Sequence, residues 1–194
     1  MKTTGYGTSK KGGKNSRNED SFLVNNDLGL YVVCDGMGGY AAGHTASALA
    51  CSSVEAFLLE NSPKFRAPSD SLRPGSLARR FVEDAIREAC LEIYEKANTE
   101  NECRGMGTTI CLVLIHGPRA IIGHVGDSRA YLLRSGTLSQ LSHDHTLVQQ
   151  LVDEGTLSPA SLLDSPYRHV LNRALGTHQS VKVDTLQIDL IPGD

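Results

Sequence analysis

Strand-like segments joined by short turns limit the fold of this chain more than any other feature. These segments are apolar and rich in β-branched residues, which is typical of strands. Strands linked by short turns pair antiparallel, because a parallel pair needs a long crossover connection. The predicted strands of this group lie at residues 108–115, 120–125 and 129–133.

The elements around these strands indicate the fold class. A hairpin is predicted near the start of the chain, around the turn Asn-Asn-Asp-Leu-Gly, and two long helices follow it, separated by a Pro/Ser-rich stretch at residues 61–76 that ends the first. Strand groups with long helices between them predict an α+β fold of layered sheets flanked by helices, in one domain at residues 1–194. The predicted elements are strands at 21–24 and 30–34, helices at 40–60 and 77–100, short helices within 146–175 and a strand at 181–191.

Composition excludes several classes of protein. A formal net charge of −3 provides no basic surface for nucleic acid. No apolar run approaches the roughly 20 residues that a membrane-spanning helix needs. The five cysteines are widely spaced and form no CxxC pair, so we expect small core residues in a reducing cytoplasm. They are Cys34, Cys51, Cys90, Cys103 and Cys111.

Carboxylates follow or precede several predicted strands. Asp20 stands before one strand, Asp35 ends the next, and Asp127 lies just beyond a third. If these strand ends meet, the carboxylates repel one another, and a divalent cation removes the conflict. Mg²⁺ and Mn²⁺ prefer such oxygen ligands, and Gly36 could add its carbonyl because its main chain can approach an ion closely. A pair of ions would activate water for phosphoryl hydrolysis.

Other interpretations of these residues were weighed. A single aspartate before glycine is more often a turn former than a ligand, and the case depends on two such segments occurring together. Residues 36–41 also fit the dinucleotide pattern GxGxxA, but Asp35 would place a negative charge beside the pyrophosphate. His143 and His145 are two residues apart, which on a strand points them to opposite sides rather than toward one zinc ion. Ser128 is expected to have a structural role in a cap or a turn, and not to act as a nucleophile.

Seven segments, taken together and in order, resemble the metal-dependent (PPM, type 2C) protein serine/threonine phosphatases in their bacterial form. The resemblance covers nearly the whole chain. It implies a four-layer αββα sandwich, in which two antiparallel sheets are flanked by helices and hold a metal centre at one end. The segments are Asn18–Asp20, Val33–Gly39, Gly43–Ser47, Gly105–Thr109, His124–Tyr131, Leu141–Thr146 and Val170–Gly176.

The resemblance also implies residue roles and substrates. The aspartate matching Asp35 bridges two Mn²⁺ or Mg²⁺ ions, the carbonyl of the residue matching Gly36 is a ligand, and the aspartate matching Asp20 supports metal-bound water. The aspartate matching Asp127 helps to hold a third ion. The implied reaction is hydrolysis of phosphoserine and phosphothreonine proteins by a metal-bridging hydroxide, often on substrates of a partner serine/threonine kinase.

Departures from the family pattern favour an alternative. The phosphate-gripping arginine of the family is replaced here by Asn15, with Lys14 or Arg17 as the expected substitutes, and His44 replaces a usual glutamate. The chain also stops at Asp194, before two aspartates of the family's second metal site, so its C-terminal part is expected to be missing. The alternative is a weak or inactive phosphatase-fold module that binds a phosphoprotein or signalling partner.

Overall fold

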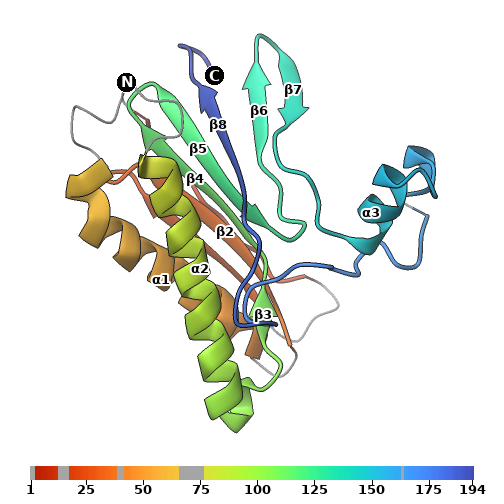
Figure 1. The fold of residues 1–194 in the computed structure, drawn as a ribbon. Coiled ribbons are helices and arrows are strands. Elements are labelled where there is room, and N and C mark those ends of the chain that lie inside the picture. The colour runs from red at the N-terminus through yellow and green to blue at the C-terminus, as the bar shows by residue number, and fades with distance from the viewer. Residues whose placement is uncertain (1–2, 13–17, 39–41, 66–76, 163) are drawn as a thin grey trace.

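The main element of the structure, a computed structural model, is an antiparallel sheet (Figure 1). All residues are described except 1–2, 13–17, 39–41, 66–76 and 163. The strand order is β1-β2-β4-β5-β8, and the short strand β3 also pairs with β2. The strands are β1 (Asp20–Asn25), β2 (Leu30–Met37), β3 (Gly107–Thr108), β4 (Ile110–His116), β5 (Arg119–Val125) and β8 (Asp184–Asp189).

Tight turns set the register of the two hairpins within this sheet. Between β1 and β2, the Asn25 side chain accepts a hydrogen bond of 2.8 Å from the Leu28 N–H, and Gly29 has φ of 71°. Between β4 and β5, Gly117 has φ of 61°. Both positions lie in the left-handed region that glycine adopts at little cost. The two predicted hairpins are therefore confirmed.

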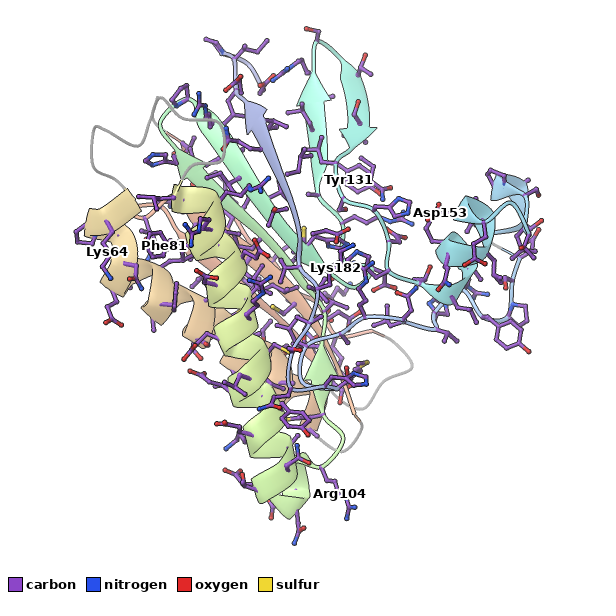
Figure 2. The ribbon with its side chains drawn as sticks, in the orientation of Figure 1. Lys64, Phe81, Arg104, Tyr131, Asp153 and Lys182 are labelled. Carbon is purple, nitrogen blue, oxygen red and sulfur yellow. The ribbon has the colours of Figure 1, made fainter. Side chains whose placement is uncertain are left out.

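Two long helices, α1 (Ala42–Phe65) and α2 (Leu77–Thr99), cover one face of the sheet (Figure 1). Small residues let α2 approach closely, since a side chain at Gly123 of β5 would meet Val82 and Ile86 at 2.7 and 2.6 Å. The helices also contact each other, with the Phe57 and Phe81 ring centroids 6.3 Å apart (Figure 2 labels Phe81). No helix in the described ranges combines the length and apolar character needed to cross a bilayer.

A second, two-stranded antiparallel sheet lies beyond the opposite face. It consists of β6 (Tyr131–Arg134) and β7 (Thr137–Gln140), joined by Ser135 and Gly136 with φ of 50° and 79°. The chain then enters the short helix α3 (Leu147–Asp153), whose N-cap residue Thr146 accepts a hydrogen bond from the Gln149 N–H. Two antiparallel sheets with helices confirm the predicted α+β sandwich class.

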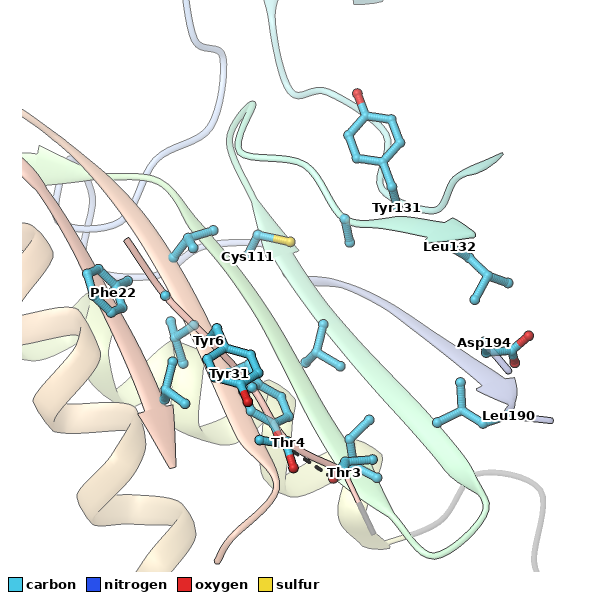
Figure 3. A pocket seen from close by; sticks show the side chains of 18 of the residues that line it. Thr3, Thr4, Tyr6, Phe22, Tyr31, Cys111, Tyr131, Leu132, Leu190 and Asp194 are labelled. Carbon is cyan, nitrogen blue, oxygen red and sulfur yellow. Dashed lines mark hydrogen bonds between the residues drawn. The ribbon is translucent and has the colours of Figure 1, made fainter. Parts of the chain in front are cut away.

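A cavity of about 900 Å³ lies between the two sheets (Figure 3). Its walls include Phe22 and Tyr31 of the main sheet and Leu132 of β6. N-terminal residues 3–8 also line it, and glycine is required there because a Cβ at Gly5 or Gly7 would meet the Tyr31 or Phe22 ring. This cavity is mostly apolar and contains none of the predicted metal ligands.

Several element boundaries differ from the prediction, and two of them have a clear physical reason. The first helix was expected to end at residue 60, but it continues through Pro63 to Phe65. Proline is tolerated because it removes only one hydrogen bond, next to a half-exposed Leu59 whose carbonyl can turn to water. The strand expected at residues 30–34 runs to Met37, so Asp35 lies inside a strand and not at its end.

Candidate metal centre

Asp20 and Asp35 are direct cross-strand neighbours in the β1–β2 hairpin. Directly opposite residues of an antiparallel pair have neighbouring side chains on the same face of the sheet. Burial together with the nearby charges of Asp20, Asp127 and Glu19 raises the pKa of Asp35 to about 6. Neighbouring ionised carboxylates repel each other, and a shared cation would relieve that repulsion.

Two threonines fix the backbone of Asp35. The Asp35 N–H donates to the Thr109 hydroxyl at 3.0 Å, and the Asp35 carbonyl accepts from the Thr109 N–H at 2.9 Å. The same carbonyl accepts from the Thr108 hydroxyl at 3.0 Å. Both threonines are buried, so these bonds are shielded from competing water. Asp35 therefore projects from a rigid support.

Thr109 also links Asp35 to the Asp127 segment. Its hydroxyl lies 2.7 Å from that of Ser128, the residue after Asp127. β4 lies between β2 and β5, and Thr109 stands just before β4, so it bridges the ends of its two neighbours. Ser128 is thus a structural link between the two segments, and its predicted cap or turn role stays a prediction. Thr109 is a site residue that could not be identified from the sequence.

Gly36 lies where β2 meets the start of α1. A Cβ at this position would meet the Gly43 carbonyl, and it would also lie 2.7 Å from the Glu19 carbonyl oxygen. The Gly36 N–H donates to the same Glu19 oxygen at 3.2 Å. Glycine is therefore required by close packing of three backbone segments, and the role of its carbonyl as a metal ligand stays a prediction.

Two of the three carboxylates open into a cleft of about 470 Å³, which Asp20 does not line. Asp35 and Asp127 lie on its wall together with Met37 and Thr109. The segment before β8 supplies the remaining lining residues, which are His169, Leu171–Ala174, Thr177 and His178. This cleft is smaller than the apolar cavity between the sheets, but it is the one that contains the predicted chemistry.

The donor set of this cleft fits a hard divalent cation. Arg173 is the only described lining residue with a permanent positive charge, and it donates to Asp184 at 2.9 Å rather than to the carboxylate pair. Within the described chain, no group of three or more carboxylate, imidazole or thiol side chains could hold an ion. An ion at Asp20 and Asp35 would therefore take further ligands from water and carbonyl oxygen, as Mg²⁺ and Mn²⁺ commonly do.

The remaining predicted residues are placed as follows. Lys14, Asn15 and Arg17 lie outside the described residues, so the phosphate-binding prediction stays open. His143 is exposed and lies 2.7 Å from Asp153, whereas His145 is buried and contacts Asp184. All five cysteines are buried free thiols.

Comparisons with known proteins identify the family of this chain. The family model described as protein phosphatase 2C matches residues 7–156. The serine/threonine protein phosphatase PstP of Mycobacterium tuberculosis is 37% identical over 171 residues, which is 88% of this chain. The chain spans only 30% of that relative's length.

Solved structures of the same relative share the fold. The crystal structure of the M. tuberculosis phosphatase PstP/Ppp matches with a TM-score of 0.80 and 35% identity, covering 96% of this chain and 73% of that one. The catalytic domain of PstP in complex with two manganese ions matches with a TM-score of 0.76 and 33% identity, covering 95% and 71%. The chain thus spans roughly three quarters of those solved structures.

Proposed function

The chain belongs to the protein phosphatase 2C family, and we propose on this basis that it is a metal-dependent protein serine/threonine phosphatase. The observation that carries the proposal is the cross-strand pairing of Asp20 with Asp35, together with a cleft that Asp35 and Asp127 line and that has no free cationic partner among its described residues. The proposed substrates are phosphoserine and phosphothreonine proteins, supplied by a serine/threonine kinase.

Each carboxylate has a distinct proposed role. Asp35 holds the metal centre because its backbone is fixed by Thr108 and Thr109. Asp20 accepts a hydrogen bond from water and orients it, the Gly36 carbonyl completes the ligand set, and Asp127 adds charge for a further ion. The chemistry that Mn²⁺ or Mg²⁺ supplies at such a site is a hydroxide nucleophile at neutral pH and neutralisation of phosphoryl oxygens.

The proposed reaction is direct hydrolysis. Hydroxide attacks phosphorus, the bond from phosphorus to the serine or threonine oxygen breaks, and that oxygen leaves with a proton. No protein side chain becomes covalently modified, which is consistent with the hydrogen bond that occupies the Ser128 hydroxyl. Lys14 or Arg17 is proposed to bind the substrate phosphate. The five buried free thiols support a cytoplasmic location.

One observation favours a second candidate function. The described residues contain no group of three His, Cys, Asp or Glu side chains that could hold an ion, and a metal site with few side-chain ligands binds its ion weakly. A module of this kind would recognise a phosphoprotein without hydrolysing it. Both candidates have the same fold, but only the first hydrolyses the phosphoprotein that it binds.

Hydrolysis of a phosphothreonine peptide tests the proposal. We expect release of phosphate with Mn²⁺, none with a chelator, and a loss of at least about a hundredfold in Asp35→Ala. His178→Ala serves as a control, because this residue lines the same cleft but is not one of the proposed metal ligands. Metal-dependent peptide binding without phosphate release would favour the second candidate, and phosphate release that is insensitive to chelator would refute the metal mechanism.

A further inference from the structure

One residue, His145, holds the Gly126 peptide from both sides. The Gly126 N–H donates to His145 Nδ1 at 3.1 Å, and the Gly126 carbonyl accepts from the His145 N–H at 2.8 Å. Gly126 has φ of 108°, and a Cβ there would lie 2.6 Å from Thr109. The chain therefore passes through a glycine-only conformation immediately before Asp127, and that conformation depends on external support.

His145 is itself fixed in position and in tautomer. Only 3% of its surface is exposed, and its ring centroid lies 4.8 Å from that of His124. A backbone N–H can only donate, so Nδ1 carries no proton and the proton is on Nε2. Nε2 lies 3.1 Å from both the Asp184 carboxylate and Arg173 Nη1. Because arginine can only donate, the protonated Nε2 donates to Asp184, which also accepts from Arg173 at 2.9 Å.

The charges around the ring keep this arrangement at neutral pH. The pKa of His145 is lowered to about 4, chiefly by burial and also by the charges of Arg173 and His124, against the opposing effect of Asp184. The imidazole therefore stays neutral and Nδ1 stays an acceptor. A protonated ring would donate at both nitrogens and could not accept from Gly126.

We propose that His145 is a positioning residue for Asp127, fixing the Gly126 peptide so that the Asp127 carboxylate points into the metal cleft. The inference rests on the proposed function, because it takes Asp127 as a group that serves the ion. Residues that orient a ligand from outside the coordination shell commonly change metal affinity by about 10–100-fold. His145 would act through Gly126, without touching ion or substrate.

Two matched substitutions separate this role from simple core packing. In His145→Asn, the amide oxygen can take the place of Nδ1 and accept from Gly126, but the contact with Asp184 is lost. In His145→Gln, the amide nitrogen can take the place of Nε2 and donate to Asp184, but Gly126 loses its acceptor. Both variants leave a cavity and a polar group, so a purely structural role predicts similar effects.

The experiment combines amide hydrogen exchange of Gly126, measured by NMR without metal, with calorimetric titration of Mn²⁺ into the 194-residue chain. We expect the Asn variant to retain amide protection and Mn²⁺ affinity within about twofold. In the Gln variant, the Gly126 amide should exchange at least about tenfold faster, and Mn²⁺ should bind about tenfold more weakly. Equal behaviour of the two variants in both measurements, or faster exchange with unchanged Mn²⁺ affinity, would overturn the inference.

Asp127→Asn distinguishes failure of this inference from failure of the proposed function. Because His145 acts through Asp127, adding His145→Gln to Asp127→Asn should weaken Mn²⁺ binding no further. If His145→Gln instead disturbed the whole domain, the losses of Mn²⁺ affinity from the two substitutions would add. If Asp127→Asn alone leaves Mn²⁺ affinity unchanged, the ligand assignment fails and the link from His145 to the ion fails with it. Amide exchange at Gly126 would still decide whether His145 holds the peptide.

Discussion

Asp35→Asn should stabilise the metal-free protein and destabilise the metal-loaded one. The pKa of Asp35 is raised from 3.8 to about 6. At about 1.4 kcal/mol per pH unit, ionised Asp35 would lower the free energy of unfolding by about 3 kcal/mol. Because the residue is exposed, solvent screening reduces this loss of stability to about 1 kcal/mol. The loss grows as pH rises from 3.8 to about 6 and is complete above that.

Thermal unfolding at pH 7.5 measures this effect. With chelator, the variant should melt about 2–4 °C above wild type, since about 1 kcal/mol shifts the midpoint of a chain of this size by that amount. With Mn²⁺ at about 100 times its dissociation constant, wild type should gain about 2.7 kcal/mol and the variant far less, so the order reverses. Asp153→Asn, on the exposed surface of α3, is the control and should not reverse. A variant that is less stable than wild type in chelator would refute the idea that these carboxylates oppose each other.

Three further predictions concern stability, each measured by urea unfolding of the free chain. Gly36→Ala should lower the free energy of unfolding by at least about 2 kcal/mol, because its Cβ meets two backbone carbonyls. Gly12→Ala is the control and should leave stability unchanged, because a Cβ there has nothing within 4 Å. Equal stabilities of the two variants would contradict the packing argument. Thr109→Val should cost about 1–3 kcal/mol because the Asp35 N–H loses its acceptor, and exposed Thr137→Val should cost little. The pKa of His145 is about 4 in the folded chain and 6.5 when unfolded, so the free energy of unfolding of wild type should fall by up to about 3 kcal/mol as pH falls from 6.5 to 4. This fall should be absent from His145→Asn.

The hairpin that carries the metal pair could be predicted from the sequence. Turn residues located it, and an antiparallel hairpin places residues that are equally distant from the turn opposite each other, as Asp20 and Asp35 are. The end of the strand was predicted wrongly because Gly36 looks like a turn residue. Its actual role is to allow the start of α1 to approach β2.

The supporting residues could not be predicted in the same way. Thr109 joins β2 to the Asp127 segment only because β4 lies between β2 and β5, which local sequence does not state. The contact between His145 and Asp184 depends on β8 adding to the edge of β5, where Asp184 pairs with His124. Such contacts join residues far apart in the chain, and no local pattern of spacing or turn chemistry marks them.

The location of bound manganese tests the central claim most directly. Crystals of this chain grown with Mn²⁺ would be measured at the manganese absorption edge, and the anomalous difference map would show where the ion binds. We predict a peak in contact with the carboxylates of Asp20 and Asp35, at the Asp127 side of the cleft, which disappears in Asp35→Ala crystals. A peak only elsewhere on the molecule, or one that survives in Asp35→Ala, would contradict the account.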